Sequence, residues 1–364
     1  MKQLQLISLF IFFSTMINAQ PNSYQFLVGT YTKNTSAKGI YSIQFDAALT
    51  PKTSLLAALD DPNFLCFSPD NQFLYSLTAK ANETGVSAFK IEQDKLVFIN
   101  KVDFGFNPGA CHVSASNNHV VVANYGEGSV YVLGRTSDGS LTSVVQKIQH
   151  VGSSVNAKRQ DKAHAHQAVF SPDFKYVLVS DLGVDKVYVY KYDATNLSSP
   201  LSLAQEFSVK AGSGPRHLTF DKAGKFAFLL HELDGSVSVL GFKNGQLKLV
   251  SSSTVVLKND IQTGAADIHL SADGRFLYAT NRGTANDITC FKVAKNGTLS
   301  FVQQVSVEGN GPRNFAISRD GKFVLVGNQW THAVTFFRRN VKTGMLTFGE
   351  LRVDLGSPVC FLEY

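Results

Sequence analysis

Short runs of alternating apolar and polar residues follow one another along most of this chain of 364 residues. Ser236-Val-Ser-Val-Leu-Gly-Phe is one such run, and the Asn244-Gly245 pair after it is a favoured turn between two antiparallel strands. Because the side chains of a strand point alternately to its two faces, a period of two predicts β-strands. The abundance of Phe and Tyr favours strands as well.

One phrase recurs about every fifty residues: a short apolar strand, a polar turn and a strongly apolar strand. Two further strands follow each hairpin, so each repeat predicts the four strands of a propeller blade. The copy at Ser114 is weaker than the others. The copies begin at Phe67, Ser114, Phe170, Phe220, Leu270 and Ile317.

The two ends of the chain each hold part of one more repeat. Near the N-terminus three strands lack a first strand, and Pro358-Val-Cys-Phe-Leu is a first strand without followers. Joined, they complete a further blade and remove the open sheet edges. We therefore predict an all-β, seven-bladed β-propeller over residues 20–364 as a single domain, its last blade closed by N- and C-terminal strands. Phe361 should lie on the inner strand of the blade that holds Val28 and Ile43.

The first residues have the three-part layout of a secretory signal peptide. A short basic start at Lys2 precedes an apolar run over 4–17, and Ala19 offers a small residue at the cleavage site. We expect residues 1–19 to be removed and the protein to be exported, to the periplasm or the medium. Neither this run nor any later one reaches the roughly 18 apolar residues of a spanning helix, so membrane insertion is not expected.

Composition and charge narrow the function classes. With 44% hydrophobic and 17% charged residues, the chain can bury a large core. The net charge is +6, but the basic residues are scattered, which argues against nucleic-acid binding and leaves room for a small anionic ligand. The four cysteines are widely spaced, which favours buried apolar side chains over metal ligands. We expect a monomer.

Blade geometry predicts where a binding site would lie. The first strand of a blade lines the central channel and the second runs back antiparallel, so residues just before the first and just after the second share one mouth of the channel. Four residues before each repeat start stand Asn63, Ala110, His166, Arg216, Ala266 and Arg313. Twelve residues after it stand Ala79, Gly126, Leu182, Glu232, Arg282 and Gln329, and eleven after it Thr78, Tyr125, Asp181, His231, Asn281 and Asn328.

Ionisable residues that converge at one mouth predict a binding or catalytic site. The candidate catalytic residues are His166, Arg216, Glu232 and Arg282. The 56-residue spacing before the third repeat start marks an insertion that should form a rim over the site. The candidate substrate-binding residues are Arg159, Gln160 and His164 from this insertion, with Asp181 and His217.

Several of these residues could instead have a purely structural role. Asp181 would serve as the cap of its own turn, and Arg313 as an ordinary surface charge. The four catalytic candidates could merely pair with one another and tie blades together. His164 and His166 could hold a metal, but no third ligand of a suitable type is evident, so no metal is expected.

Several motifs, taken in order, resemble the seven-bladed lactonase family, which includes the propeller-type 6-phosphogluconolactonases and the fungal carboxymuconate cyclases. The motifs are Gly29-Thr-Tyr-Thr, Ala123-Asn-Tyr-Gly-Glu-Gly-Ser-Val, Ser180-Asp-Leu-Gly-Val-Asp, Gly214-Pro-Arg-His-Leu, Asn281-Arg-Gly and Gly311-Pro-Arg-Asn-Phe. In the cyclase branch a His, two Arg and a Glu form the proposed active-site set. The resemblance places them at His166, with His164 as competitor, and at Arg216, Glu232 and Arg282. The chain departs from the family in having His231 in place of Asn and Asp267 in place of Glu.

The resemblance implies a lactone hydrolase that needs no cofactor and opens a sugar-derived, anionic lactone such as 6-phosphogluconolactone. The expected signal peptide is a further departure from the family, because a cytoplasmic enzyme of the pentose-phosphate route would not need one, and it makes the expected enzyme an exported one. Arg216 and Arg282 would hold a phosphate or carboxylate and stabilise charge on the carbonyl oxygen. His166 or Glu232 would take the proton of the attacking water. Two alternatives stay open: a muconate cycloisomerase that uses the same residues, and a secreted ligand-binding propeller without turnover.

Overall fold

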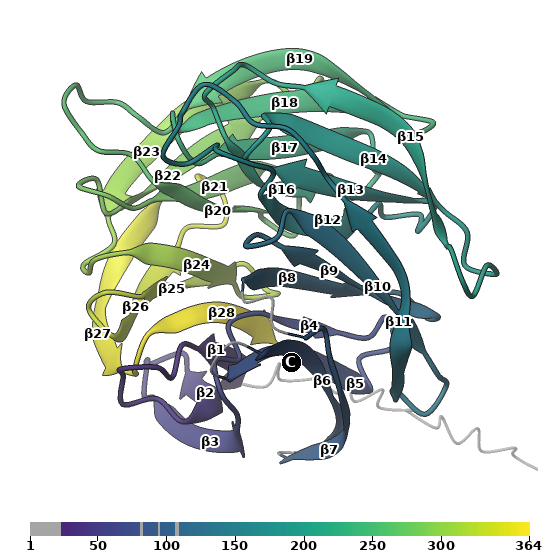
Figure 1. Ribbon diagram of the computed structural model, residues 1–364. Helices are drawn as coiled ribbons and strands as arrows, with labels where there is room; N and C mark the ends of the chain where they lie inside the picture. The colour runs from purple at the N-terminus through teal and green to yellow at the C-terminus, as the bar shows by residue number, and fades with distance from the viewer. Residues whose placement is uncertain (1–22, 81–82, 94, 106–108) are drawn as a thin grey trace, which may run out of the picture.

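The computed structural model describes residues 23–364, except 81–82, 94 and 106–108. The expected signal peptide, residues 1–19, lies outside the described residues. The described part is built of strands, which form seven antiparallel four-stranded sheets arranged as a ring (Figure 1). No helix that could span a membrane occurs in this part of the chain. The prediction of a seven-bladed propeller is confirmed.

We number the blades by chain order from the first complete one and give each from its innermost strand outward. Blade 1 consists of β4 (Leu65–Phe67), β5 (Phe73–Lys80), β6 (Glu83–Glu92) and β7 (Lys95–Asp103). Blade 2 consists of β8 (Ala110–Ala115), β9 (His119–Asn124), β10 (Ser129–Arg135) and β11 (Leu141–Gln149). Blade 3 consists of β12 (Ala165–Phe170), β13 (Tyr176–Asp181), β14 (Lys186–Tyr192) and β15 (Leu201–Ser208).

The next three blades repeat this order. Blade 4 consists of β16 (Pro215–Phe220), β17 (Phe226–His231), β18 (Ser236–Lys243) and β19 (Gln246–Thr254). Blade 5 consists of β20 (Ala265–Leu270), β21 (Phe276–Asn281), β22 (Asp287–Val293) and β23 (Leu299–Ser306). Blade 6 consists of β24 (Pro312–Ile317), β25 (Phe323–Asn328), β26 (Ala333–Arg339) and β27 (Leu346–Asp354).

Blade 7 joins the two ends of the chain. It consists of β28 (Pro358–Glu363), β1 (Ser23–Thr30), β2 (Gly39–Asp46) and β3 (Lys52–Ala58). Phe361 pairs with Val28, and Ile43 pairs with Phe26, so the predicted closure is confirmed. Figure 1 shows β28 beside β1 although they stand at opposite ends of the sequence.

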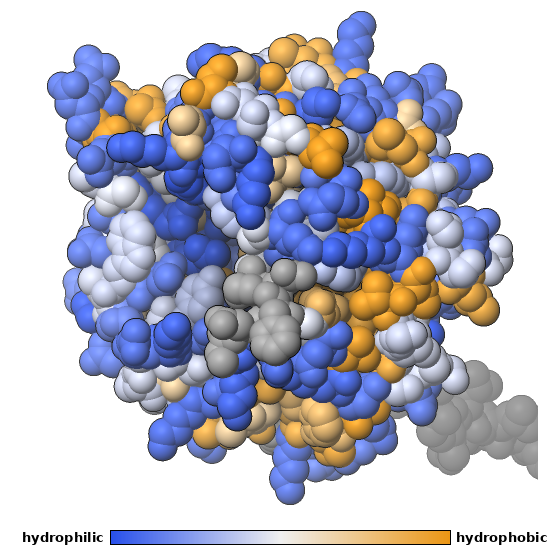
Figure 2. Space-filling view, viewed as in Figure 1, coloured by the Kyte–Doolittle hydropathy of each residue, from blue (hydrophilic) through white to orange (hydrophobic). Residues whose placement is uncertain are grey.

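The core lies mainly between neighbouring blades. Val120 and Val122 of blade 2, for example, pack against Phe73 and Tyr75 of blade 1 in one buried cluster. Fully burying such a side chain contributes about 1.5–3 kcal/mol before the cost of ordering it. The face of the ring seen in Figure 2 is mostly hydrophilic, with small hydrophobic patches. The sheets thus form a rigid frame, and the strand ends at the channel mouth carry the polar residues.

Candidate active site

The inner strands of blades 2 to 7 carry an irregularity of pairing near their first residue. In blade 3, Ala165 pairs with Asp181 and Gln167 with Ser180, so His166 between them has no partner on β13. A β-bulge of this kind turns the extra side chain out of the regular alternation. The skipped residues are Cys111, His166, Arg216, Arg313 and Val359 in blades 2, 3, 4, 6 and 7, with Ala266 and Asp267 in blade 5. In blades 3, 4 and 6 the bulge therefore directs a histidine or arginine side chain to one mouth of the channel.

Glu232 directly follows β17 and is fixed by its own backbone. Its N–H donates to the carbonyl of Gly214, 2.7 Å away, in the turn that leads into β16. Gly214 has a φ of +65°, a conformation that favours glycine. The Gly214-Pro-Arg sequence thus holds Arg216 and Glu232 at the same mouth.

The carboxylate of Glu232 is surrounded by guanidinium groups. Oε2 lies 2.9 Å from Nε of Arg216 and 3.0 Å from Nη2 of Arg282, and Oε1 lies 2.5 Å from Nη2 of Arg159. Glu232 is 5% exposed and Arg216 only 1%. The structure therefore brings together Arg216, Glu232 and Arg282, as predicted, and adds Arg159 from the insertion.

The arginines control the charge of Glu232. Burial alone would raise the pKa of this carboxyl, but Arg282, Arg216 and Arg159 together lower it to about 2. Burial, and then repulsion from Arg282, lowers the pKa of Arg216 to about 9, despite the attraction of Glu232. Arg216 remains protonated and Glu232 ionised at neutral pH, so the cluster carries more positive than negative charge.

His166 is the imidazole that faces this cluster. Its Nε2 lies 3.9 Å from Oε2 of Glu232, and its Nδ1 lies 3.8 Å from Sγ of Cys111. The ring packs edge-on against Tyr125 and His217. Burial, and then the charge of Arg216, lowers the pKa of His166 well below 6.5, so the ring is neutral at pH 7. A neutral imidazole can accept a proton from a bound water.

The insertion between β11 and β12 lies over the cluster, with its three candidate residues in different surroundings. The side chain of Arg159 is 42% exposed and reaches Glu232 and the hydroxyl of Tyr125. His164 stacks on Tyr125, its Nδ1 donates to the carbonyl of that residue at 2.8 Å, and its Nε2 lies 3.2 Å from Asp161. Gln160 is fully buried and donates to the carbonyl of Leu182. His164 and Gln160 therefore hold the loop in place.

Asp181 lies outside the cluster. It is fully buried, and its carboxylate accepts hydrogen bonds from the backbone N–H groups of His164 and Gly183. Its other oxygen lies 2.7 Å from Nδ1 of His150. These contacts correspond to the turn-capping alternative and anchor the insertion to blade 3.

His217 lies next to Arg216 but faces the channel. Its Nδ1 donates to Oδ1 of Asp267 at 2.8 Å, and the other oxygen of Asp267 accepts from Asn314 and from Nε2 of His269. Burial, and then Arg216, lowers the pKa of His217 to about 4. Asp267 thus fixes the orientation of a neutral His217 beside the ring of His166.

In the second repeat, counting along the sequence missed Cys111 and placed Tyr125 only at the position eleven residues after the repeat start. The count placed Ala110 and Gly126 at the mouth positions, whereas the bulged residue is Cys111 and the residue that follows β9 is Tyr125. The signal for Tyr125 was its place in a motif shared with the lactonase family. Cys111, as a small apolar residue type, gave no such signal.

Comparison with known proteins places the chain among lactonases. The chain is 36% identical to a 6-phosphogluconolactonase of Bacillus subtilis, over 92% of this chain and 96% of that protein. A 6-phosphogluconolactonase of Formosa agariphila is 34% identical, over 88% of this chain and 93% of the other. The crystal structure of a periplasmic gluconolactonase of Pseudomonas aeruginosa superposes with a TM-score of 0.88 at 34% identity, covering 94% of this chain and 99% of that one.

The family profile described as "Lactonase, 7-bladed beta-propeller" matches residues 25–363. This match spans nearly all the described strands, including the bulged inner strands and the Gly-Pro-Arg turns. The chain therefore belongs to the seven-bladed β-propeller lactonase family.

Proposed function

We propose that this protein is a lactonase of the 6-phosphogluconolactonase type, which acts as a monomer on a sugar-derived lactone. The observation that carries the proposal is the neutral ring of His166 held 3.9 Å from a buried carboxylate that three guanidinium groups surround. Such a site offers a proton acceptor beside concentrated positive charge. Hydrolysis of a lactone requires both, because water must lose a proton while the carbonyl oxygen gains negative charge.

In the proposed reaction, Nε2 of His166 takes a proton from water as the water oxygen attacks the lactone carbonyl. Arg216 and Arg282 stabilise the negative charge that builds on the carbonyl oxygen. The tetrahedral intermediate collapses with cleavage of the ring C–O bond, and the imidazolium returns its proton to the departing alkoxide. The products are the free acid and hydroxyl group of the opened ring.

Glu232 has a different role in this scheme. A carboxyl with a pKa of about 2 is a poor proton acceptor at neutral pH. It can instead orient the arginines and stabilise the transient positive charge on His166. Of the two candidate bases that sequence reasoning left open, the geometry favours His166.

A substrate panel tests the proposal. Purified protein without residues 1–19 would be assayed with D-glucono-1,5-lactone, its 6-phosphate and a muconate, with spontaneous hydrolysis subtracted. We expect faster ring opening of a lactone. Turnover of the muconate alone would indicate a cycloisomerase, and saturable binding without product would indicate a ligand-binding propeller.

We expect lactone hydrolysis to withstand chelation. The guanidinium groups can supply the stabilisation for which other hydrolases use a metal ion. No three His, Cys, Asp or Glu side chains in the described part of the chain are placed to share an ion. Activity should be unchanged after EDTA treatment and dialysis, and a loss that a divalent cation restores would contradict the scheme.

The pH profile should report the depressed pKa of His166. Only the neutral ring can accept a proton, so kcat/KM should be level through pH 6.5, where a free histidine titrates, and fall at more acidic pH. The assay should use the unphosphorylated lactone, because a phosphate ester has its own ionisation near pH 6. An acid limb centred at or above pH 6.5 would argue against His166 as the base.

Export is part of the proposal. The N-terminal layout of residues 1–19 and the periplasmic location stated for the Pseudomonas aeruginosa relative both support it. N-terminal sequencing of native protein should begin near Gln20, and recovery of Met1 would contradict export.

A further inference from the structure

Arg313 is the bulged arginine that takes no part in the cluster around Glu232. It stands at the position on β24 that His166 holds on β12 and Arg216 on β16. Among the described residues, no hydrogen bond or ion pair of its guanidinium group is found. Its contact is with Tyr31, whose ring centroid lies 5.5 Å from Cζ. A half-buried guanidinium without an acid partner can still bind an anion.

The positive charge of Arg313 acts on the proposed catalytic residues. Its charge contributes to lowering the pKa of His166 and of Arg216. Tyr31 follows β1 just as Glu232 follows β17, so it belongs to the same mouth. Arg313 therefore lies at the proposed site and not on a remote surface.

A cavity of about 470 Å³ opens beside Tyr31. This volume is within the ordinary range for small-molecule sites. Trp330, which is 52% exposed, lines the cavity. Its ring also touches Gly311, since a Cβ added there would come within 2.6 Å of it. The cavity thus adjoins the Gly311-Pro-Arg turn that carries Arg313.

One acidic side chain, that of Asp61, lines this cavity, and its Oδ1 is hydrogen-bonded to neighbouring residues of the described chain. Asp61 accepts hydrogen bonds from the N–H and hydroxyl groups of Thr32, at 2.6 and 3.1 Å, and from the N–H of Lys33 at 3.1 Å. Lys33 itself adds a positive charge to the lining. The charges of Lys33 and Asp61 balance, so the cavity taken together with its neighbour Arg313 has a net positive charge, which favours an anion.

We propose that Arg313, with the cavity beside Tyr31 and Trp330, forms the subsite that binds the anionic group of the lactone and so distinguishes charged from neutral lactones. This inference rests on the proposed function. It reassigns anion binding from Arg216 and Arg282, whose guanidinium groups are engaged by Glu232, to the arginine at the mouth that has no such partner. The bound group is a phosphate ester or a carboxylate at the end of the sugar away from the reacting carbonyl.

The test compares the wild type with Arg313→Met on D-glucono-1,5-lactone, its 6-phosphate and a carboxylated lactone, D-glucaro-1,4-lactone. Loss of a charge-assisted hydrogen bond should lower kcat/KM for the preferred anionic lactone by about 10- to 100-fold, mainly through KM. The neutral lactone should change by less than about 3-fold, because it has no anionic group for Arg313 to bind. The two anionic substrates distinguish a phosphate subsite from a carboxylate subsite.

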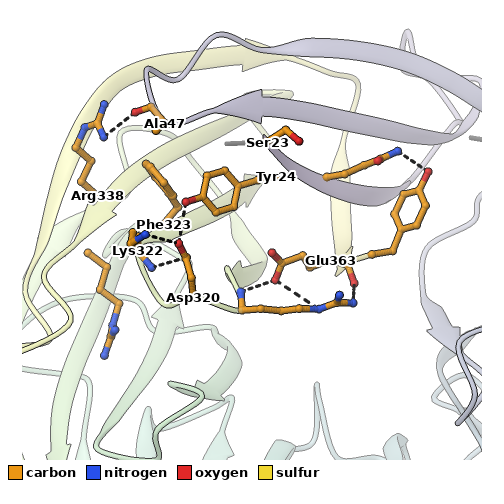
Figure 3. A pocket seen from close by; sticks show the side chains of 12 residues that line it. Ser23, Tyr24, Ala47, Asp320, Lys322, Phe323, Arg338 and Glu363 are labelled. Atoms are coloured by element: carbon orange, nitrogen blue, oxygen red, sulfur yellow. Dashed lines mark hydrogen bonds and ion pairs between the residues drawn. The ribbon is translucent and has the colours of Figure 1, made fainter. Parts of the chain in front are cut away.

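Arg338→Met is a matched control. The Arg338 guanidinium also lies 5.5 Å from an aromatic ring, that of Phe323, but at the other end of blade 6. Figure 3 shows it at the edge of a separate cavity, where it donates to the carbonyl of Ala47. This variant removes the same charge and the same kind of ring contact, and should leave the substrate preference unchanged.

Measuring the binding of reaction products tests the subsite even if the protein does not hydrolyse lactones. Trp330 is the only tryptophan of the chain, so its fluorescence reports on the cavity. The products 6-phosphogluconate and glucarate should bind the wild type more tightly than gluconate and change this fluorescence, whereas Arg313→Met should lose the preference. Equal binding of gluconate and of the two more highly charged products by the wild type, an unchanged fluorescence at saturation, or an equal loss for charged and neutral lactones in Arg313→Met would overturn the inference.

Discussion

Replacing His166 with glutamine should lower kcat for lactone hydrolysis by about 10²–10⁴-fold, the usual contribution of a general base. Glutamine keeps a polar side chain but cannot take a proton from water at neutral pH. The Tm should change little, because the nearest polar contacts of the ring are long, at 3.8 Å to Cys111 and 3.9 Å to Glu232. Steady-state kinetics and thermal unfolding of the same sample measure both quantities.

His119→Gln controls for the loss of a buried histidine. His119 lies at the start of β9, away from the mouth, and its Nδ1 is 2.8 Å from the hydroxyl of Tyr192. This variant should lower the Tm and leave kcat of the folded protein near the wild-type value. If His166→Gln instead lost stability and kept its turnover, its role would be structural.

Replacing Glu232 with glutamine should lower both stability and activity. The substitution leaves three buried or half-buried guanidinium groups without their carboxylate, and breaking a buried ion pair costs about 3–5 kcal/mol. A shift of the carboxyl pKa from 4.5 to about 2 corresponds to a similar value, about 3 kcal/mol. The value of kcat should fall too, because the arginines and the transient imidazolium lose their orienting charge.

The stability effect has a defined pH dependence. The folded-state pKa of Glu232 is below its unfolded value, so its stabilisation is present above pH 4.5 and is lost as the pH falls towards 2. The difference in unfolding free energy between wild type and Glu232→Gln should therefore be large at pH 7 and shrink at pH 3. Urea unfolding at the two pH values measures it, since other acidic groups such as Asp267 contribute equally to both proteins. A difference that stays constant with pH would contradict the assigned charge.

The propeller could be predicted from the sequence because its signals are local and repeated. A hairpin turn recurs at regular spacing, and the unmatched strands at the two ends fit one blade, as the pairing of Phe361 with Val28 shows. The repeat count was off by one residue in blade 2, because the hairpin of that blade is shorter. In blade 2 the N–H of Ser116 bonds to the carbonyl of His119, three residues on, whereas in blade 3 Ser171 bonds to Tyr176, five residues on.

The site was predicted only in part. Repeat positions located Arg216, Glu232 and Arg282, because antiparallel pairing determines which strand ends share a mouth. They could not reveal the bulges. A bulge depends on how two strands pair, and the alternation of apolar and polar residues along a single strand does not show it. Nor could the repeat positions show that Asp181 would form a hydrogen bond with His150, or that Arg313 would have no acid partner among the described residues, because both depend on contacts between distant segments.

We propose that the cluster around Glu232 and His166 hydrolyses lactones. The most direct measurement is the rate of ring opening of D-glucono-1,5-lactone and its 6-phosphate by the purified mature protein, beside His166→Gln and a blank without protein. We expect the wild type to open at least one of the two lactones well above the rate of the blank, and His166→Gln to fall most of the way back to that rate. A wild type no faster than the blank on both lactones, or a variant as fast as the wild type, would contradict the proposal.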